Sequence, residues 1–312
     1  MKVIFISSGN TQNGISPIVS NQGESLKKEG VEIDFFTIQG RGAKGYIKSI
    51  FRLRSYLKNS NYDVVHAHYW ISGIVTSFAG AKNIVVSLMG DDVKAKRWFR
   101  WIIYLFYRLS WSKTIVKSKD MYETFGQKDV SIIPNGIDMD RFKPIDRDIA
   151  LKVTQWDIEK KHILFTSNPN RVEKNFKLAK DAITYIGNQE IELHYLVDIP
   201  NEQIPYYYNS ADVVILTSLW EGSPNAIKET MACNVPIVST NVGDVKDIIN
   251  RTEGCFISSF EYKEFASKIE KALKYNKRTN GREAIVHLKS DVIAKKIVNI
   301  YNGIVKEKKC VE

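Results

Sequence analysis

The sequence predicts an α/β protein built from two Rossmann-like domains, each a doubly wound parallel sheet. Short β-rich runs alternate with longer amphipathic segments through both halves of the 312-residue chain. These runs are apolar throughout rather than alternating, as expected of strands covered on both faces. The polar, poorly periodic segment 144–161 separates two series of such runs, so we place the hinge there.

The first half is expected to contain six strands with helices between them. The helix predicted over 17–29 follows Ser16 as N-cap, has Pro17 at its first position and ends before Gly30. A second helix is predicted over 44–58, where apolar residues recur at helical spacing. The predicted strands are 2–8, 32–38, 63–69, 83–89, 114–118 and 130–134.

The second half repeats this rhythm without repeating the sequence. Strand, helix and strand at this spacing indicate right-handed crossovers and parallel sheets. We therefore expect one domain over 1–145, a second over 146–290, and a final helical segment, 291–312, that could cross back to the first. In such sheets ligands bind beyond the carboxyl ends of the strands. The predicted strands are 162–167, 191–197, 212–218, 236–240 and 255–258.

Composition and charge narrow the class of protein. The chain is 44% hydrophobic and 26% charged, and its three cysteines lack metal-type spacing, so we expect a reduced cytosolic protein. The apolar start is too short for a signal peptide, and no run approaches the roughly 20 apolar residues of a membrane span. Residues 1–143 hold 21 Lys and Arg against 12 Asp and Glu, a difference of +9 within a total of +10. A basic half indicates a phosphate-bearing partner.

The stretch LWEGSPNAIKETMACNVPIVST, residues 219–240, carries the strongest chemical signal. Glu221 lies in the loop after a predicted strand, Ser223 and Pro224 are predicted to begin a helix, and Glu229 falls in its second turn. Free amides at a helix start suit a diphosphate, and a carboxylate suits two neighbouring hydroxyls. The alternative is that both glutamates are ordinary surface residues, with Glu229 favoured by the helix dipole.

EGSPNAIKE resembles the E-x7-E signature of retaining glycosyltransferases with the GT-B fold, in particular glycosyltransferase family 4. Other segments resemble the same family in the same order along most of the chain, so the set is more specific than any one motif. They are DVVHAHYWISG (63–73), SIIPNGIDMDRFKP (131–144), EKN (173–175) and PIVSTNVGDVKDII (236–249).

The resemblance implies roles for particular residues. Glu229 would hold the ribose hydroxyls of a donor nucleotide, and Glu221 would lie beside the transferred sugar. Lys174 would neutralise the leaving diphosphate. The turn that would lay backbone amides against sugar and phosphate consists of Gly222, Ser223, Pro224 and Asn225.

The chain departs from the family pattern at two positions. The family usually has an arginine five residues before the lysine, where this chain has Pro169, and Arg171 is the available substitute. The family often has a histidine where this chain has Met89, so no imidazole can act from that position. Arg171 and Lys174 could also be ordinary solvated charges.

Other residues are expected near the substrates in the first domain. Gly90 allows close backbone approach, Asp91 could accept from a sugar hydroxyl, and Gly14 lies in a loop between strand and helix. His68 is a candidate catalytic residue, although it shares a strand face with His66 and the pair could be structural. The resemblance implies no bound metal, no cofactor and no metal site, and the sequence shows no His/Cys cluster.

Residues 94–113, KAKRWFRWIIYLFYRLSWSK, are basic at the start and then aromatic and aliphatic. A helix lying in a membrane interface has this composition, and so does a core helix with a solvated basic first turn. Contact with an anionic membrane surface would suit a lipid-phosphate-linked acceptor. Nucleic acid is not expected, since no recognition motif is present.

The family resemblance thus implies a metal-independent, retaining hexosyltransferase that uses a UDP- or GDP-linked sugar. The acceptor would be a sugar or lipid-linked sugar in polysaccharide or glycolipid biosynthesis. We expect the enzyme in the cytoplasm or peripherally on the cytoplasmic face of a membrane. Two alternatives stay open, a non-catalytic nucleotide-sugar-binding protein and a GT-B-type sugar-nucleotide epimerase.

Overall fold

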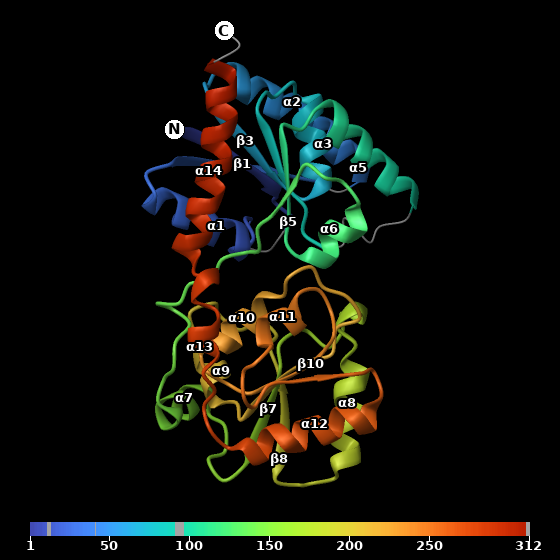
Figure 1. Cartoon of the computed structure of the whole chain (residues 1–312), viewed down its shortest axis with the longest axis vertical. Helices are drawn as coiled ribbons and strands as arrows, with labels where there is room; N and C mark the ends of the chain where they lie inside the picture. The colour runs from blue at the N-terminus through green and yellow to red at the C-terminus, as the bar shows by residue number, and fades with distance from the viewer. Residues whose placement is uncertain (11–13, 41, 91–96, 310–312) are drawn as a thin grey trace. The chain divides into compact units, whose positions relative to one another are not determined.

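The computed structural model describes residues 1–10, 14–40, 42–90 and 97–309 and confirms the predicted fold class (Figure 1). The chain divides into two compact units, each with a parallel sheet and flanking helices. Unit 1 comprises Met1–Gly136 and Ser290–Glu312, and unit 2 comprises Ile137–Lys289.

The sheet of unit 1 has six strands in the order β2-β1-β3-β4-β5-β6, all parallel. Residues of β1 alternate between two cores, because Ile4 and Ile6 pack on one face of the sheet and Val3 and Phe5 on the other. The strands are β1 Lys2–Ser8, β2 Glu32–Ile38, β3 Val64–His68, β4 Ile84–Ser87, β5 Lys113–Val116 and β6 Val130–Ile132.

Helices cover both faces of this sheet. One core contains residues from the helices over 42–58, 70–78, 97–109 and 119–125, and the other contains residues from the helices over 17–28 and 290–309. The last helix, α14, belongs to unit 1, where it packs beside α1, and Tyr301 on it is fully buried. The helices are α1 Pro17–Lys28, α2 Gly42–Lys58, α3 Trp70–Phe78, α5 Arg97–Leu109, α6 Lys119–Phe125 and α14 Ser290–Lys309.

The sheet of unit 2 has five parallel strands in the order β11-β10-β9-β7-β8. The strands are β7 Lys161–Phe165, β8 Ile191–Tyr195, β9 Val213–Leu216, β10 Ile237–Thr240 and β11 Phe256–Ser258. The helices are α7 Arg147–Thr154, η1 Val172–Lys174, α8 Phe176–Ile186, α9 Ile204–Ser210, α10 Asn225–Ala232, α11 Val245–Ile249, α12 Tyr262–Tyr275, α13 Gly281–Ala284 and η2 Val286–Leu288.

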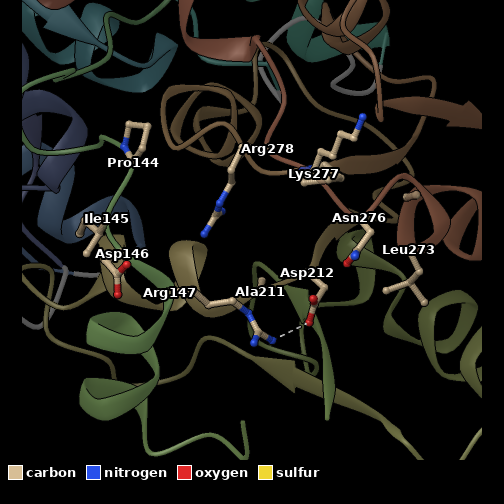
Figure 2. Close-up of a pocket in the computed structure, with 12 residues that line it drawn as sticks. Pro144, Ile145, Asp146, Arg147, Ala211, Asp212, Leu273, Asn276, Lys277 and Arg278 are labelled. Carbon is tan, nitrogen blue, oxygen red and sulfur yellow. Dashed lines mark hydrogen bonds and ion pairs between the residues drawn. The ribbon is translucent and has the colours of Figure 1, made fainter. Parts of the chain in front are cut away.

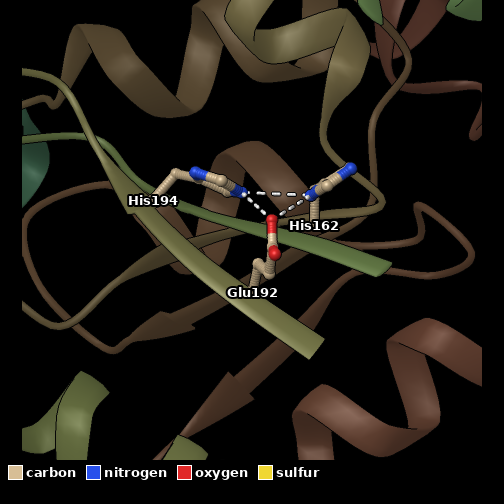
Figure 3. A group of neighbouring side chains, drawn as sticks. All are labelled: His162, Glu192 and His194. Atoms are coloured by element: carbon tan, nitrogen blue, oxygen red, sulfur yellow. Dashed lines mark hydrogen bonds and ion pairs between the residues drawn. The ribbon is translucent and has the colours of Figure 1, made fainter. Parts of the chain in front are cut away.

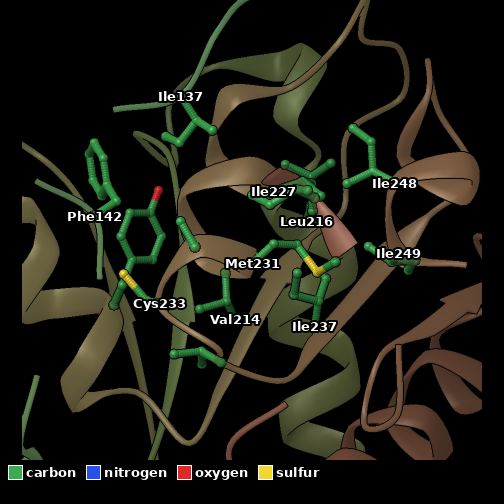
Figure 4. Close-up of a cluster of buried hydrophobic side chains, with 14 of the residues drawn as sticks. Ile137, Phe142, Val214, Leu216, Ile227, Met231, Cys233, Ile237, Ile248 and Ile249 are labelled. Atoms are coloured by element: carbon green, nitrogen blue, oxygen red, sulfur yellow. The ribbon is translucent and has the colours of Figure 1, made fainter. Parts of the chain in front are cut away.

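Strand β9 shows why the second-half strands are apolar throughout. Val214 and Leu216 pack into the core drawn in Figure 4, together with Ile227 of α10. Val213 and Ile215 point to the other face and pack into a second core. Because both faces are covered, polar alternation is absent from this strand.

The division between the units lies earlier than the predicted boundary after residue 145. Ile137, Met139 and Phe142 are buried in the core of unit 2, and the Ile137 amide donates to the Leu288 carbonyl at 2.9 Å. The segment 144–161, expected to be the hinge, contains α7, which packs against α9. Its polar residues are the solvent side of a short amphipathic helix.

Among the helices of the described ranges, none combines the length and the apolar character needed to cross a bilayer.

Candidate functional site

The E-x7-E stretch forms the loop at the carboxyl end of β9 and the helix that follows it. Helix α10 begins at Asn225, with Pro224 as its N-cap residue and no side-chain capping bond. The prediction that Ser223 caps this helix is therefore wrong. Its hydroxyl donates instead to Asp244 Oδ2 at 2.5 Å. A largely buried carboxylate is a strong hydrogen-bond acceptor, so the hydroxyl is engaged there and does not cap α10.

Glu221 forms an ion pair with Lys174 at this loop. Lys174 Nζ lies 2.5 Å from Glu221 Oε1, and the Ser218 hydroxyl donates to the same oxygen at 2.7 Å. The two charged side chains are only 13% and 15% exposed. The structure thus brings together two residues, 47 positions apart, that the sequence assigned to one site.

The loop after β7 is tied to the end of β9, which holds Lys174 in place. The Thr217 hydroxyl donates to the carbonyls of Lys174 at 2.8 Å and Asn175 at 3.0 Å. The Leu219 amide donates to the Glu173 carbonyl at 2.9 Å. These bonds fix the backbone of residues 173–175. The position of Lys174 is therefore determined by the end of β9 rather than by a free loop.

Arg171 lies on the same loop but contacts a different carboxylate. Its Nη2 is 2.5 Å from Glu173 Oε1, and its side chain is 56% exposed. Arg171 therefore reaches towards solvent, whereas Lys174 is enclosed. Its proposed role on the leaving diphosphate stays a prediction.

Glu229 lies on α10 and contacts different side chains from those around Glu221. The Tyr208 hydroxyl donates to Glu229 Oε2 at 2.7 Å. Burial raises the pKa of the Glu229 carboxyl, while the Tyr208 hydroxyl and the nearby charges of Arg141 and Lys228 act to lower the pKa. A carboxylate near cations in a partly enclosed place can accept hydrogen bonds from neighbouring hydroxyls.

Sequence reasoning missed residues after β10 that support the turn. Gly243 has φ +56°, and a Cβ there would lie 2.6 Å from the Gly222 carbonyl oxygen and 3.1 Å from that of Glu221. Gly243 lies in the segment whose resemblance was noted, and a glycine between a strand end and a helix is the signal that could have identified it. Lys228 was also missed: it is fully buried, and burial lowers its pKa to about 8.

Unit 1 contains the candidate residues His68, Gly14 and Gly90. His68 is 2% exposed and stacks on His66 at a centroid distance of 4.4 Å, so the two share a face as expected. Burial, and to a lesser degree Lys117, lowers the pKa of His68 to about 3, so the ring is neutral near pH 7. Gly14 and Gly90 have φ of 76° and 123°, which a glycine adopts readily.

Asp91 lies outside the described residues. The assignments of His68, Gly14, Gly90 and Asp91 to a substrate site stay predictions.

A pocket of about 430 Å³ lies elsewhere in unit 2 (Figure 2). It is lined by Asp212 and Pro236, which precede β9 and β10, and by Arg147 and Arg278. Arg147 pairs with Asp212 at 3.1 Å, as the dashed line in Figure 2 shows. The pocket therefore lies at the amino ends of the strands, whereas Glu221 lies beyond their carboxyl ends.

Comparisons with known proteins identify the family of the chain. The family model described as Glycosyltransferase Family 4 matches residues 13–141, and the one described as Glycosyl transferases group 1 matches residues 174–285. A UDP-Gal:alpha-D-GlcNAc-diphosphoundecaprenol alpha-1,3-galactosyltransferase of Escherichia coli is 23% identical over 82% of this chain and 76% of that protein. A putative teichuronic acid biosynthesis glycosyltransferase, TuaC, of Bacillus subtilis is 25% identical over 62% of this chain and 57% of its own length.

Solved structures show the same fold. A sucrose-phosphate synthase from Thermosynechococcus elongatus superposes with a TM-score of 0.82 at 17% identity, covering 98% of this chain and 99% of that one. Anabaena HepE in complex with UDP gives a TM-score of 0.72 at 16% identity, covering 97% and 100%. Together the two family models span most of both units, with the E-x7-E turn inside the second. The chain is therefore a GT-B glycosyltransferase of family 4.

Proposed function

We propose that this glycosyltransferase transfers a hexose from a nucleoside diphosphate donor to an acceptor hydroxyl with retention of the anomeric configuration. The observation that carries the proposal is the enclosed ion pair of Lys174 and Glu221 at the carboxyl end of the unit 2 sheet. The donor would bind there, with its sugar beside Glu221 and its diphosphate near Lys174. Ligands of doubly wound sheets bind at this edge.

Lys174 would act on the leaving group. The leaving nucleoside diphosphate gains negative charge as the glycosidic bond breaks, and a fixed cation stabilises that charge in the transition state. Backbone amides of the turn from Gly222 to Asn225 would add hydrogen bonds to the sugar and phosphate. Protein cations would do this work without a metal, and the leaving phosphate would take the proton of the acceptor hydroxyl.

Glu229 would bind the ribose. Tyr208 holds its Oε2 atom, and we assign Oε1 to the ribose hydroxyls of the donor. The nucleotide of the donor would be UDP or GDP, since a contact to the ribose does not distinguish the two. UDP in the Anabaena neighbour and the UDP-Gal donor in the name of the E. coli relative support a nucleotide sugar.

The acceptor we propose is a sugar or a lipid-linked sugar in polysaccharide or glycolipid assembly. A diphosphoundecaprenol-linked acceptor appears in the name of the E. coli relative, and teichuronic acid synthesis in that of the B. subtilis relative. The +9 balance of residues 1–143 fits a phosphate-bearing acceptor.

The nucleotide assignment is tested by thermal shift with UDP, GDP and their sugars. We expect one nucleoside diphosphate to raise Tm, and Glu229→Ala to weaken its binding roughly 10- to 100-fold. Hydrogen bonds to a charged group contribute about 1.5–3 kcal/mol each, which gives this range. Glu270→Ala, which changes an exposed glutamate of α12, is the matched control. Nucleotide affinity unchanged in Glu229→Ala would contradict the ribose assignment.

Catalysis is separated from simple binding by donor turnover. A transferase is expected to release nucleoside diphosphate slowly from the nucleotide sugar even without acceptor. Tight donor binding with no turnover, with or without a panel of acceptors, would favour the non-catalytic alternative. Conversion of the donor sugar into an epimer would favour the epimerase.

We also propose that α5 places unit 1 on an anionic membrane. One face of α5 belongs to the core, since Ile103 is 1% exposed. Another face exposes Trp101 at 65% and Leu109 at 77%, and Arg108 lies beside Leu109 in the sequence. Residues 94–96 of the stretch 94–113 lie outside the described residues, and along α5 the two interpretations apply to different faces of the helix. Amphipathic helices with Trp and Leu opposite basic residues bind in the membrane interface.

Vesicle flotation tests the membrane proposal. The protein is expected to float with phosphatidylglycerol vesicles at low salt and to dissociate at high salt. Trp101→Ser should weaken binding roughly tenfold or more, because burying one large apolar side chain contributes about 1.5–3 kcal/mol. Val286→Ser, which changes an exposed apolar residue of unit 2, is the control. Absence of flotation at low salt would exclude the proposal.

A further inference from the structure

Three side chains that the proposed reaction does not use converge on the edge of the unit 2 sheet (Figure 3). They are His162 on β7 and Glu192 and His194 on the neighbouring strand β8. His162 lies opposite Glu192 in the parallel register, and Glu192 and His194 are two residues apart, which places them on one face. This cluster could not be predicted from local sequence, because its members come from strands about 30 residues apart and are brought together by the strand register.

The three ligand atoms form a triangle of suitable size for one ion. His162 Nδ1 lies 3.0 Å from His194 Nε2, and Glu192 Oε2 lies 3.7 Å and 3.6 Å from these two atoms. A tetrahedral Zn²⁺ with bonds of about 2.0–2.1 Å to nitrogen and oxygen has ligand atoms roughly 3.3 Å apart. We propose that His162, Glu192 and His194 bind a divalent transition-metal ion, with Zn²⁺ as the best fit.

A hydrogen bond on the far side of His162 fixes the tautomer that metal binding needs. His162 Nε2 lies 2.7 Å from the Asp157 backbone carbonyl, which can only accept a hydrogen bond. Nε2 therefore carries the proton, and the lone pair of Nδ1 points into the triangle. Metal-bound histidines commonly donate their other N–H to a carbonyl or carboxylate in this way.

Contacts with other side chains also restrict Glu192 and His194. Lys160 Nζ binds Glu192 Oε1 at 2.7 Å, which leaves Oε2 directed at the histidine pair. The ring of Trp156 stacks on His194 with a centroid distance of 3.7 Å and an interplanar angle of 13°. Both contacts restrict side-chain rotation, so little conformational entropy is lost when an ion binds.

The two histidine rings are in hydrogen-bond contact in the structure. Without an ion, the 3.0 Å contact is a hydrogen bond from His194 Nε2–H to His162 Nδ1. Metal binding moves that proton to His194 Nδ1.

The location indicates a structural role. The side chain of His162 is fully buried, while those of His194 and Glu192 are 21% and 34% exposed, so water can supply a fourth ligand. Strand β8 is the edge of its sheet and pairs with β7 alone. An ion would clip this edge strand to β7, away from the carboxyl-end turn that holds Glu221.

Titration of the full chain with ZnCl2, after chelator treatment, tests the proposal without substrate. We expect one Zn²⁺ per chain by calorimetry, a higher Tm, and a tetrahedral visible spectrum with Co²⁺. Glu192→Gln and His194→Gln should each weaken Zn²⁺ binding by more than the roughly 10- to 100-fold that is typical when a residue that only orients a metal ligand is lost. His287→Gln, which changes an exposed histidine of the same unit, should leave it unchanged.

Three outcomes would overturn the proposal. One is the absence of stoichiometric Zn²⁺ binding in the folded wild type. Another is binding that survives both Glu192→Gln and His194→Gln. The third is binding that is lost instead in Cys255→Ser, which changes a free, partly buried cysteine of the same unit and would mean that the ion binds elsewhere. Since no nucleotide sugar is present, these results are independent of the proposed transfer reaction.

Discussion

Lys174→Met is expected to lower the rate of sugar transfer about 10²- to 10³-fold. Removing one preorganised group that stabilises developing negative charge costs this much in other active sites, equivalent to about 2.7–4 kcal/mol. Lys174 is only 13% exposed, and its backbone carbonyl accepts from the Thr217 hydroxyl, so the ammonium group is held at a fixed place. The measurement is release of nucleoside diphosphate at saturating donor.

Lys177→Met is the matched control for this experiment. Lys177 lies one turn further along the same segment, pairs with Asp181 and is 82% exposed. An exposed pair of this kind contributes little to stability. The control is therefore expected to retain wild-type activity and Tm.

A double variant separates a role on the phosphate from a role as partner of Glu221. Lys174→Met alone leaves the largely buried Glu221 carboxylate without its cation, which can disturb the loop. Glu221→Gln in the same chain removes that charge and keeps the hydrogen bond from Ser218. If Lys174 stabilises the leaving group, the double variant stays as far below Glu221→Gln alone in activity as Lys174→Met lies below the wild type. Activity of the double variant equal to that of Glu221→Gln alone would mean that Lys174 serves only to neutralise Glu221.

The fold could be predicted because the signal for each strand is local. Each run proposed from the sequence overlaps an observed strand, but several runs extend past the strand's end, and β5 and β7 each begin one residue before the predicted run. The run 212–218 contains β9, Val213–Leu216, followed by Thr217 and Ser218. These two side chains are buried like strand residues, yet the Thr217 hydroxyl donates to the loop after β7 and the Ser218 hydroxyl to Glu221 in the loop after β9. Apolar or buried character therefore marks the region but not the residue where the ladder ends.

The candidate site could be predicted only in part. Lys174 and Glu221 each follow a strand, and parallel strands bring such positions to one edge, so their meeting follows from topology. The hydroxyl of Ser223 could not be assigned from local sequence, because its acceptor, Asp244, lies 21 residues away. The His162 and Glu192 contact depends in the same way on the register between β7 and β8.

Gly243→Ala is expected to reduce donor turnover on the order of 10²-fold while the protein stays folded. The new Cβ would lie 2.6 Å from the Gly222 carbonyl oxygen, so the Glu221–Gly222 backbone must shift. Displacement of a positioning group by about 1 Å can cost this much in rate. Donor affinity should fall as well, because the same turn would hold the sugar and phosphate.

Gly187→Ala distinguishes this steric effect from backbone strain. Gly187 has φ +64°, close to the +56° of Gly243, but a Cβ there would meet nothing nearer than 3.9 Å. Both variants therefore carry a left-handed alanine, which costs roughly 1–2 kcal/mol, and both should lose a similar amount of stability from that source. Only Gly243→Ala should lose turnover and donor affinity. Equal activity of the two variants would show that the contact between Gly243 and Gly222 does not position the turn, and the donor would then have to be held by other parts of unit 2.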